Sequence, residues 1–519
     1  MKASAMKSAD QNQAADQSAV FAFLGDPATH RINEPVARID THGAAVFLAG
    51  ADVYKVKRAV HFSFMDFSTL EKRRRACENE LAVNRANAPD LYLGVVPISR
   101  KDMALTLGIG DEIVEWAVHL RRFDEARTLD RLAARGELDA AIMEKLAGVV
   151  VASHRAAPIL RDRNATAALA KRIEEIVTGL ERAPDVFPPA AAAKLKDAML
   201  RAFEAARPLL SRREAEGWVR RCHGDLHLRN IVMIGPTPTL FDALEFDESF
   251  AICDILYDLA FLLMDLWTRG LKAEANGLMN RYLSAFDGFE AQIEGLAALP
   301  LFLGLRAAIR ANVTNLEASK TAATIAAARR YFDESCAFLA PGPLHLAAIG
   351  GLSGTGKTSL ARALAPAVGQ APGALHLRSD VERKRLNHLT ELQRLPDEAY
   401  RPEVSAETYQ RLRDLSARAL AAGQSVIVDA AHRKPEERAG ADVAARAGAD
   451  FTGLWLEAPT AIRMARVSQR RNDASDAGPE IAAAQAQELV GPMDWLRLDA
   501  SQPMASLVAR ARAAIERKG

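Results

Sequence analysis

The stretch Gly351-Leu352-Ser353-Gly354-Thr355-Gly356-Lys357-Thr358 decides the fold of the C-terminal part of this chain. It has the form G-x-x-x-x-G-K-T, the complete Walker A pattern, in which a glycine turn between a strand and a helix surrounds phosphate with backbone N–H groups. An apolar run, 344–350, precedes the pattern and an amphipathic run, 359–365, follows it. The sequence therefore predicts an α/β P-loop NTPase domain with a parallel sheet.

This pattern also assigns tasks to individual residues of the loop. Lys357 is expected to reach the outer phosphates and to act in catalysis, and the Thr358 hydroxyl is expected to hold Mg²⁺. The residues expected to contact the nucleotide are Gly351, Ser353, Gly354, Thr355, Gly356, Lys357, Thr358 and Ser359. A merely flexible glycine loop is the alternative, but the motif and its context agree with each other.

Two later carboxylates follow predicted strands of the same sheet. Asp429 ends the apolar run 425–429, which has the Walker B form, and it is expected to assist Mg²⁺. Asp380 ends the run 374–380 and is placed to meet an acceptor hydroxyl, because ligands bind at the carboxyl ends of parallel strands. The alternative for Asp380 is an N-cap of a helix over Val381–Leu386.

An arginine-rich segment comes next and resembles the lid of a nucleotide kinase. Its arginines are Arg463, Arg466, Arg470 and Arg471, and the flexible-looking stretch 472–478 follows them. Lid arginines neutralise a transferring phosphoryl group, and Arg470 is the preferred candidate for this catalytic role. A solvated helix face is the alternative.

Length and composition limit the remaining possibilities. A chain of 519 residues is too long for one ordinary core, and its 49% hydrophobic and 26% charged residues are typical of globular domains. The net charge of +1 indicates no bulk attraction to nucleic acid or to a membrane surface. Four cysteines far apart in sequence, and the absence of an apolar leader in the first 18 residues, favour a cytoplasmic location. No apolar run is long enough to predict a membrane span.

The region before the P-loop has a small β-rich part followed by a large helical part. Strands are expected at 36–39, 45–48, 53–60, 92–98, 103–107 and 113–120, and a helix at 71–86. Helices are expected at 138–157, 165–180, 190–216 and through 255–338, with strands at 231–234 and 239–246 between them. This order is that of a bilobal, protein-kinase-like α+β fold. The expected division is a disordered tail (1–17), a kinase-like domain (18–338), a linker (339–343) and the P-loop domain (344–519).

The loop His223-Gly224-Asp225-Leu226-His227-Leu228-Arg229-Asn230 carries the chemistry expected of this first domain. Its Asp and Asn stand five positions apart, as in the kinase catalytic loop H-R-D-L-x-x-x-N. Asp225 is expected to orient and deprotonate an acceptor hydroxyl, and Asn230 to bind Mg²⁺. Asp242 is the first choice for a further metal ligand and Glu245 the second. For His227, the alternative to a site residue is a structural role in which its side chain holds the loop backbone.

This loop, with the motif H-G-D-x-H-x-x-N, and the later stretch Tyr257-Asp258-Leu259-Ala260 resemble the aminoglycoside phosphotransferase family. The resemblance covers about residues 20–338 and implies ATP-dependent phosphorylation of a small-molecule hydroxyl. It also implies a β-lobe lysine that binds nucleotide phosphates and pairs with a helix glutamate. Lys55 fits this role better than Lys57, and Glu80 better than Glu78. The turn 41–45 departs from the pattern, because it lacks a glycine-rich G-x-G-x-x-G.

Residues 343–519 resemble small P-loop kinases of the gluconate kinase, adenylylsulfate kinase and zeta-toxin type. The whole chain resembles bacterial bifunctional proteins that join an aminoglycoside-phosphotransferase-like domain to a P-loop ATP-binding domain. We therefore predict a bifunctional phosphotransferase that uses ATP and Mg²⁺ on small-molecule acceptors. An active P-loop kinase fused to a nucleotide-binding pseudokinase is the alternative, and an ATPase without an acceptor is a third reading. The acceptors and the oligomeric state stay open.

Overall fold

The computed structural model describes residues 16–62, 65–161, 163–245, 248–286, 288–316, 321–469, 473–476, 478, 480 and 492–517. These residues form two compact units, which are described separately below. The first unit comprises Met1–Ala165 and Gly217–Asp258, and the second comprises Thr166–Glu216 and Leu259–Gly519. The domain boundary predicted at 339–343 stays a prediction.

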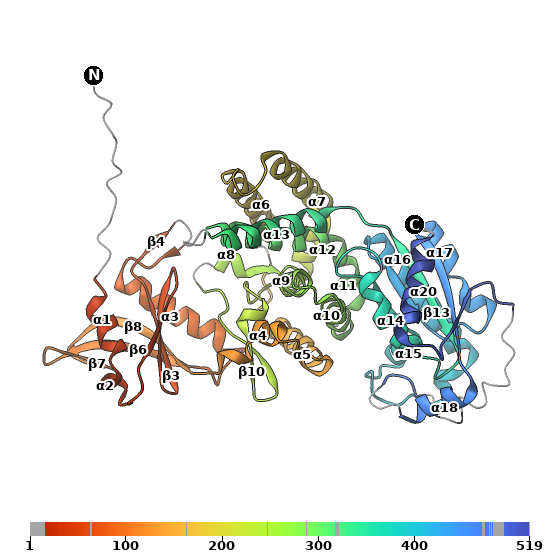
Figure 1. Ribbon diagram of the computed structural model, residues 1–519, viewed down its shortest axis with the longest axis horizontal. Coiled ribbons are helices and arrows are strands. Elements are labelled where there is room, and N and C mark those ends of the chain that lie inside the picture. The colour runs from red at the N-terminus through yellow and green to blue at the C-terminus, as the bar shows by residue number, and fades with distance from the viewer. Residues whose placement is uncertain are drawn as a thin grey trace, which may run out of the picture. The chain divides into compact units, whose positions relative to one another are not determined.

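A six-stranded antiparallel sheet begins the first unit (Figure 1). Its strands are β1 (Ala37–Asp40), β2 (Ala44–Ala49), β3 (Asp52–Lys57), β6 (Tyr92–Lys101), β7 (Ala104–Leu107) and β8 (Glu112–Arg121). Their order is β1-β2-β3-β8-β6-β7, so the third strand lies beside the last one. A two-stranded ribbon, β4 (His61–Phe62) with β5 (Met65–Asp66), accompanies this sheet. The strands predicted for this region are confirmed, with small shifts at their ends.

Helix α3 (Leu70–Arg85) packs against β3, β6 and β8. It begins where the Thr69 hydroxyl accepts the Lys72 N–H, as expected of a threonine N-cap. The buried residues of α3 recur every three or four positions, so they form one face toward the sheet: Arg73, Ala76, Cys77, Glu80 and Asn84. This spacing brings Glu80 and Asn84 to the inner side of the helix, where they can reach other parts of the unit.

The N-terminal end of the described chain is tied to the same sheet. Helices α1 (Ser18–Gly25) and α2 (Pro27–His30) precede β1, and Leu24 of α1 packs with residues of the sheet. The sequence assigns Gln17 to a disordered tail, but Gln17 is buried. Its side chain donates to the Lys57 carbonyl and to Glu115, and it accepts the Ala59 N–H, so three hydrogen bonds hold it. Residues 1–15 lie outside the described residues.

The rest of the first unit surrounds the predicted catalytic loop. This loop is preceded by helices α4 (Leu129–Ala134) and α5 (Ala140–Ala156). The elements next to it in sequence are β9 (Val219–Arg221), β10 (Ile231–Ile234), β11 (Thr237–Leu240), α8 (Glu248–Ala251) and β12 (Ile252–Asp254). The hairpin of β10 and β11 was predicted, whereas the pairing of β9 with β12 was not. The strand predicted at 239–246 has wrong bounds, because β11 runs from Thr237 to Leu240; position 246 lies outside the described residues. The ladder stops at Leu240 because Asp242 adopts a left-handed backbone, with φ of 57°.

The second unit contains the predicted helical region and the P-loop sheet. Its helices before the sheet are α6 (Ala165–Glu181), α7 (Pro189–Glu216), most of α9 (Ile255–Thr268), α10 (Lys272–Ala285), α11 (Phe289–Gly295), α12 (Leu299–Asn315) and α13 (Ala322–Leu339). By length and composition alone, the stretch Phe289–Asn315 could cross a membrane. However, 67% of its apolar 18-residue window is buried inside the protein, as in the core helix of a globular domain, so it is weak support for a membrane span.

The P-loop part contains a five-stranded parallel sheet (Figure 1); a parallel sheet was predicted, but its last strand was not. The order is β14 (Leu375–Arg378), β15 (Val426–Asp429), β13 (His345–Gly351), β16 (Asp450–Glu457) and β17 (Leu496–Asp499). Helices α14 (Lys357–Leu364) and α20 (Met504–Glu516) pack on one face through a common apolar core. Helices α16 (Pro402–Ala421) and α17 (Gly440–Arg446) contact the sheet with a separate set of residues. Among the described residues, this part also contains α15 (Ser379–Leu386) and α18 (Thr460–Gln469).

Candidate active sites

The loop between β9 and β10 brings Asp225 and Asn230 into direct contact. The Asn230 amide donates to Asp225 Oδ2 at 2.9 Å and to the Asp225 carbonyl at 3.0 Å. His227 Nε2 lies 3.3 Å from the same carboxylate oxygen. Asn230 and His227 are buried, whereas the Asp225 side chain is 41% exposed. Asn230 and His227 therefore hold the Asp225 carboxylate in place, while part of it stays accessible to solvent, as an acceptor-orienting group needs to be.

Asp258, in the first turns of α9, fixes the backbone of this loop. It is fully buried, and its oxygens accept the Gly224 N–H at 2.8 Å and the His223 N–H at 3.2 Å. His154 of α5 contributes a further contact, from Nε2 to Asp258 Oδ2 at 3.1 Å. Only the resemblance of 257–260 drew attention to Asp258, and nothing in the sequence indicated His154. Cys222 lies beside them, and the three side chains are close enough to hold a metal ion, although hydrogen bonds already occupy Asp258.

His223 packs within the loop as a neutral side chain. Burial lowers the pKa of this imidazole, despite nearby Asp258 and Asp225. Its Nε2 lies 3.0 Å from the Phe241 carbonyl, and its Nδ1 accepts the Asp225 N–H at 3.4 Å. The histidine thereby links the loop that carries Asp225 to the segment that carries Asp242.

Two side chains outside the loop hold the Asp242 segment in place. Asn84 of α3 accepts the Ala243 N–H at 2.7 Å, and the Tyr92 hydroxyl accepts the Asp242 N–H at 3.1 Å. With a left-handed backbone at Asp242, these bonds hold its carboxylate in an orientation that a continued strand would not give. Sequence reasoning missed both residues. The only available signal was the position of Asn84, one helical turn after Glu80.

Lys55 and Glu80 lie together, as the sequence predicts, but Lys57 is part of the same cluster. Lys55 Nζ is 2.8 Å from Glu80 Oε1 and 2.7 Å from Asp242 Oδ1. Lys57 Nζ is 2.5 Å from Glu80 Oε2 and also pairs with Glu245. Although burial opposes it, the charges of Lys55 and Lys57 lower the pKa of Glu80 to about 2. The rival Glu78 instead forms an exposed pair with Arg74, so it is not the partner of either lysine.

The Walker A loop of the second unit has the geometry of a phosphate cradle. Gly354 has φ of +83°, and a Cβ there would lie 2.4 Å from the Arg463 carbonyl oxygen, so only glycine fits. Lys357 stands at the start of α14, with Nζ folded onto the Leu352 carbonyl at 3.2 Å. The helix begins two residues before the predicted run 359–365, so its N-terminal N–H groups face the loop.

Thr358 and Asp429 meet at the end of the central strands. The Thr358 hydroxyl donates to Asp429 Oδ2 at 2.6 Å. Burial opposes ionisation of Asp429, but His376, Lys357 and Arg378 nevertheless hold its pKa below the usual value. His376 Nε2 lies 3.6 Å from the same oxygen, and Arg378 Nε 3.9 Å away. The sequence did not indicate a role for His376.

Asp380 lies close to this charged group, but it does not cap the helix. Helix α15 starts at Ser379 with Arg378 as its N-cap, so the alternative of Asp380 as an N-cap is wrong. Burial raises the pKa of Asp380, and the charge of Asp429 raises it further. A carboxylate whose pKa is raised accepts a proton more readily than an ordinary aspartate does.

Two of the predicted lid arginines contact the backbone of the P-loop. Arg463 Nη1 donates to the Ser353 carbonyl at 3.4 Å, and Arg466 Nη1 to the Thr355 carbonyl at 3.3 Å. Both belong to α18, which therefore braces the loop from outside. Arg470, the preferred catalytic arginine, lies outside the described residues, as does Arg471.

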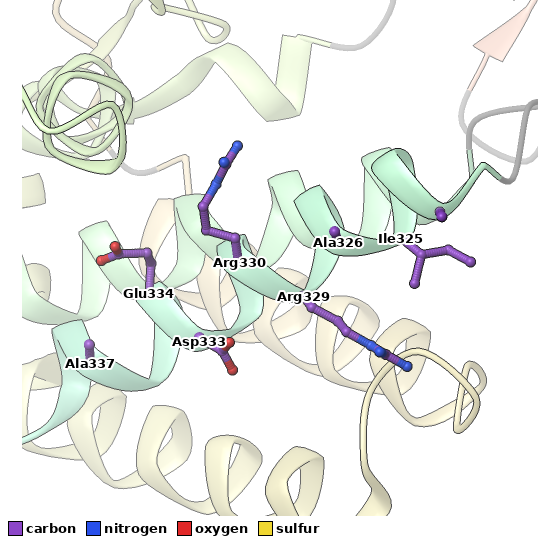
Figure 2. Close-up of a pocket in the computed structure, with 8 residues that line it drawn as sticks. Ile325, Ala326, Arg329, Arg330, Asp333, Glu334 and Ala337 are labelled. Carbon is purple, nitrogen blue, oxygen red and sulfur yellow. The ribbon is translucent and has the colours of Figure 1, made fainter.

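An open hollow of about 750 Å³ lies on α13, and none of the predicted site residues lines it (Figure 2). All of its lining residues come from this one helix. Figure 2 shows Arg330 and Glu334 on one side of the helix, and Arg329 and Asp333 on the other. A hollow made by one helix offers no converging polar groups, so it is a poor candidate for a catalytic site.

Comparison with known proteins divides the chain in the same order. Residues 47–292 match the model of the phosphotransferase enzyme family, and residues 346–492 match the model of an AAA domain. "Uncharacterized protein Rv2004c" of Mycobacterium tuberculosis (strain H37Rv) is 28% identical over 488 residues, which cover 91% of this chain and 94% of that protein.

Solved structures resemble one part of the chain at a time. A sugar kinase from Janibacter sp. HTCC2649 is 25% identical and covers 34% of this chain and 95% of its own, with a TM-score of 0.26. A thermostable mutant of aminoglycoside phosphotransferase APH(4)-Ia is 14% identical and covers 61% of this chain and 97% of its own, with a TM-score of 0.38.

Proposed function

Because the chain joins a phosphotransferase-family domain to a P-loop domain of the AAA type, we propose that it is a bifunctional ATP-dependent phosphotransferase. Each part transfers the terminal phosphoryl group of ATP to a hydroxyl group of a small-molecule acceptor. Positioning and electrostatic stabilisation supply most of the catalysis in such reactions, so both sites need fixed charged groups rather than a covalent nucleophile.

In the first part, Asp225 orients the acceptor hydroxyl and accepts its proton. The carboxylate suits this task because Asn230 and His227 hold it from behind while it stays exposed in front. Lys55 binds the nucleotide phosphates, and Glu80 positions that lysine. The fixed backbone of the loop, anchored on Asp258, keeps the proton acceptor in line with the phosphoryl group.

In the second part, Asp380 takes the role of proton acceptor and Lys357 that of phosphate ligand. Lys357 Nζ donates to a loop carbonyl, whose place as acceptor a phosphate oxygen can take. Arg463 and Arg466 keep the loop in shape by binding its carbonyls. Arg470 is proposed as the arginine that neutralises the transferring group.

Both sites offer the oxygen ligands that Mg²⁺ prefers. Thr358 and Asp429 would hold the ion in the second part, where their oxygens already lie 2.6 Å apart. Asp242 and Asn230 would hold it in the first part, where three carboxylates face two lysines, so that one negative charge is not balanced within this cluster. The bound ion would offset phosphate charge, while the residues named above orient the acceptor and move its proton.

The observation that carries the proposal is the contact between Asp225 and Asn230 in the first unit, matched by that between Thr358 and Asp429 in the second. The experiment is a screen for phosphate transfer from labelled ATP into a pool of cell metabolites. The protein should carry Lys357→Ala, so that only the first part is active. Asp225→Asn should then reduce transfer by roughly 10²–10⁴-fold while ATP binding persists.

One observation favours a second candidate, in which the first part binds nucleotide without transferring phosphate. The turn between β1 and β2 uses its own backbone groups, because Thr41 N–H donates to the Ala44 carbonyl and Ala44 N–H to the Thr41 hydroxyl. These groups are therefore not free for phosphate oxygens. This pseudokinase reading expects no transfer by the Lys357→Ala protein on any acceptor, so the same screen separates the two functions.

A further inference from the structure

Two lysines on β3 share one glutamate of α3. Lys55 and Lys57 are two positions apart on the strand, so both side chains leave the same face of the sheet. Lys55 Nζ lies 2.8 Å from one Glu80 oxygen, and Lys57 Nζ lies 2.5 Å from the other. A single lysine would be enough to pair with this glutamate, so the second lysine needs its own explanation.

The two lysines differ in their second partner and in their access to solvent. Lys55 also pairs with Asp242 at 2.7 Å, whereas Lys57 also pairs with Glu245. The exposed fractions of the five side chains rise from the inside outward: Glu80 0%, Lys57 2%, Glu245 10%, Lys55 17% and Asp242 44%. The cluster therefore has a closed end, built on Lys57, and an open end, built on Lys55 and Asp242.

The two ends of the cluster also differ in how their charges are balanced. Two ammonium groups face three carboxylates, and the carboxylate most open to solvent is Asp242. At the closed end, burial works against the charge of Lys57, but Glu245 and Glu80 outweigh it and raise the pKa of this lysine. Lys57 is therefore a permanent cation between two carboxylates that have little access to water.

We propose that Lys57 is a fixed counter-ion that holds Glu80 and Glu245, so that Lys55 can leave Asp242 for the nucleotide phosphates. Glu245 is then a structural partner of Lys57 rather than a metal ligand, and Asp242 becomes free for the cation once Lys55 has left. Lys57 is a positioning residue, because it acts through Lys55. This inference rests on the proposed function only in taking the first part to bind ATP.

The energetic reason lies in what a moving lysine leaves behind. A buried carboxylate that loses its only cation destabilises the protein strongly, which opposes the movement. Here Glu80 keeps its bond to Lys57 when Lys55 turns toward a phosphate, so no buried carboxylate is left unpaired. Without Lys57, the single remaining lysine would be drawn toward Glu80 and Glu245, which lie away from the open end.

The direct test is covalent labelling of the full-length protein with an acyl phosphate derivative of ATP. The amine of a lysine near the phosphates attacks the acyl carbon, an amide forms, and ATP leaves with the electrons of the broken carbon–oxygen bond. Peptide mapping should find Lys55 and Lys357 labelled, with excess ATP and Mg²⁺ suppressing both. Labelling of Lys57 in place of Lys55 would overturn the inference. If neither Lys55 nor Lys57 is labelled, the result would instead overturn nucleotide binding by the first part, on which the proposed function depends.

Variants then test the counter-ion itself. Lys57→Met should slow labelling of Lys55 by roughly tenfold or more, because the lysine is then held by two buried carboxylates. The double variant Lys57→Met/Glu245→Gln removes both members of one pair, but Glu80 then has Lys55 as its only cation within this cluster, so labelling should be faster than in Lys57→Met yet stay slower than in the wild type. Lys72→Met, an exposed lysine of α3, is the matched control and should leave labelling unchanged.

Two results would contradict the inference. Wild-type labelling of Lys55 in Lys57→Met would mean that no counter-ion is needed. If the double variant loses the Mg²⁺-dependent protection of Lys55 by ATP, Glu245 acts on the metal and not only on Lys57. If Lys57→Met alone does not fold, labelling of the double variant gives the test instead, because Glu245→Gln removes the carboxylate that would otherwise lose its lysine.

Discussion

Replacing Asp258 by asparagine should loosen the catalytic loop while preserving the shape of the site. The two Asp258 oxygens accept the N–H groups of His223 and Gly224 and also contact His154. An asparagine offers one oxygen and one NH₂ group, so one buried N–H would face a donor and lose its acceptor. The other contacts would lose the charge that strengthens them.

The magnitude follows from these bonds. An unsatisfied buried donor costs about 1–3 kcal/mol, and loss of the charge weakens the remaining bond by about 1 kcal/mol. Together the cost of about 2–4 kcal/mol corresponds to a roughly 30- to 1000-fold larger opening constant of the loop. Because Asp258 is fully buried, solvent cannot replace the lost interaction.

Hydrogen–deuterium exchange of the peptide over 219–230 measures this opening directly, since the Gly224 amide itself donates to Asp258. The peptide should exchange faster by that factor, while a peptide over 346–357 should not change. Asp265→Asn is the matched control, because Asp265 lies on the same helix but pairs with the Arg269 side chain. Equal exchange of 219–230 in Asp258→Asn and the wild type would refute the role of Asp258 as the anchor of the loop.

The remaining predictions concern the second unit. Lys357→Ala should lower phosphate transfer by this part by roughly 10²-fold or more without unfolding it, and near-wild-type turnover would show that the loop is not catalytic. In an Asp225→Asn background, transfer should fall on acidification at a higher pH than an ordinary aspartate would give, because the pKa of Asp380 is raised; a profile without this limb would exclude Asp380 as the proton acceptor. Asn280 of α10 accepts the His376 N–H of β14, so Asn280→Ala should speed exchange of the β14 amides. For the same reason fragment 344–519 should melt at a lower temperature than fragment 271–519, and equal melting would contradict a stabilising role of α10.

Local motifs explain why much of the site could be predicted from sequence. Asp225 and Asn230 are five positions apart in one loop, so their contact follows from the local backbone alone. Lys357 and Thr358 belong to a single turn between a strand and a helix. In these two cases a short spacing fixes the geometry. The pairing of Lys55 with Glu80 instead came from the family resemblance, which implies a β-lobe lysine and a helix glutamate.

The features that were missed depend on contacts far apart in sequence. Asn84 holds the backbone of Ala243, 159 positions later, and no pattern marks an asparagine that binds a backbone group. The run 239–246 reads as a strand because its residues alternate, but the chain turns at Asp242 under these distant bonds. Likewise, the sequence could not show that Glu80 pairs with Lys57 as well as with Lys55, because this depends on how α3 packs on the sheet.

The contact between α10 and β14 shows how packing can cross a boundary that the sequence suggests. Strand β14 lies at the edge of its sheet, where unpaired backbone groups favour wrong pairing. Asn280 accepts the His376 N–H at 2.7 Å, and the amides of Asn276 and Asn280 both donate to the Ala374 carbonyl, at 3.0 and 3.2 Å. Two side chains one helical turn apart thus take the place of a neighbouring strand. His376 in turn lies beside Asp429, the carboxylate proposed to bind metal in the P-loop part. Helix α10, which precedes the proline-rich stretch 340–343 in sequence, therefore supports the strand that carries His376. We therefore expect catalysis by that part to depend on residues that its own sequence motifs do not include.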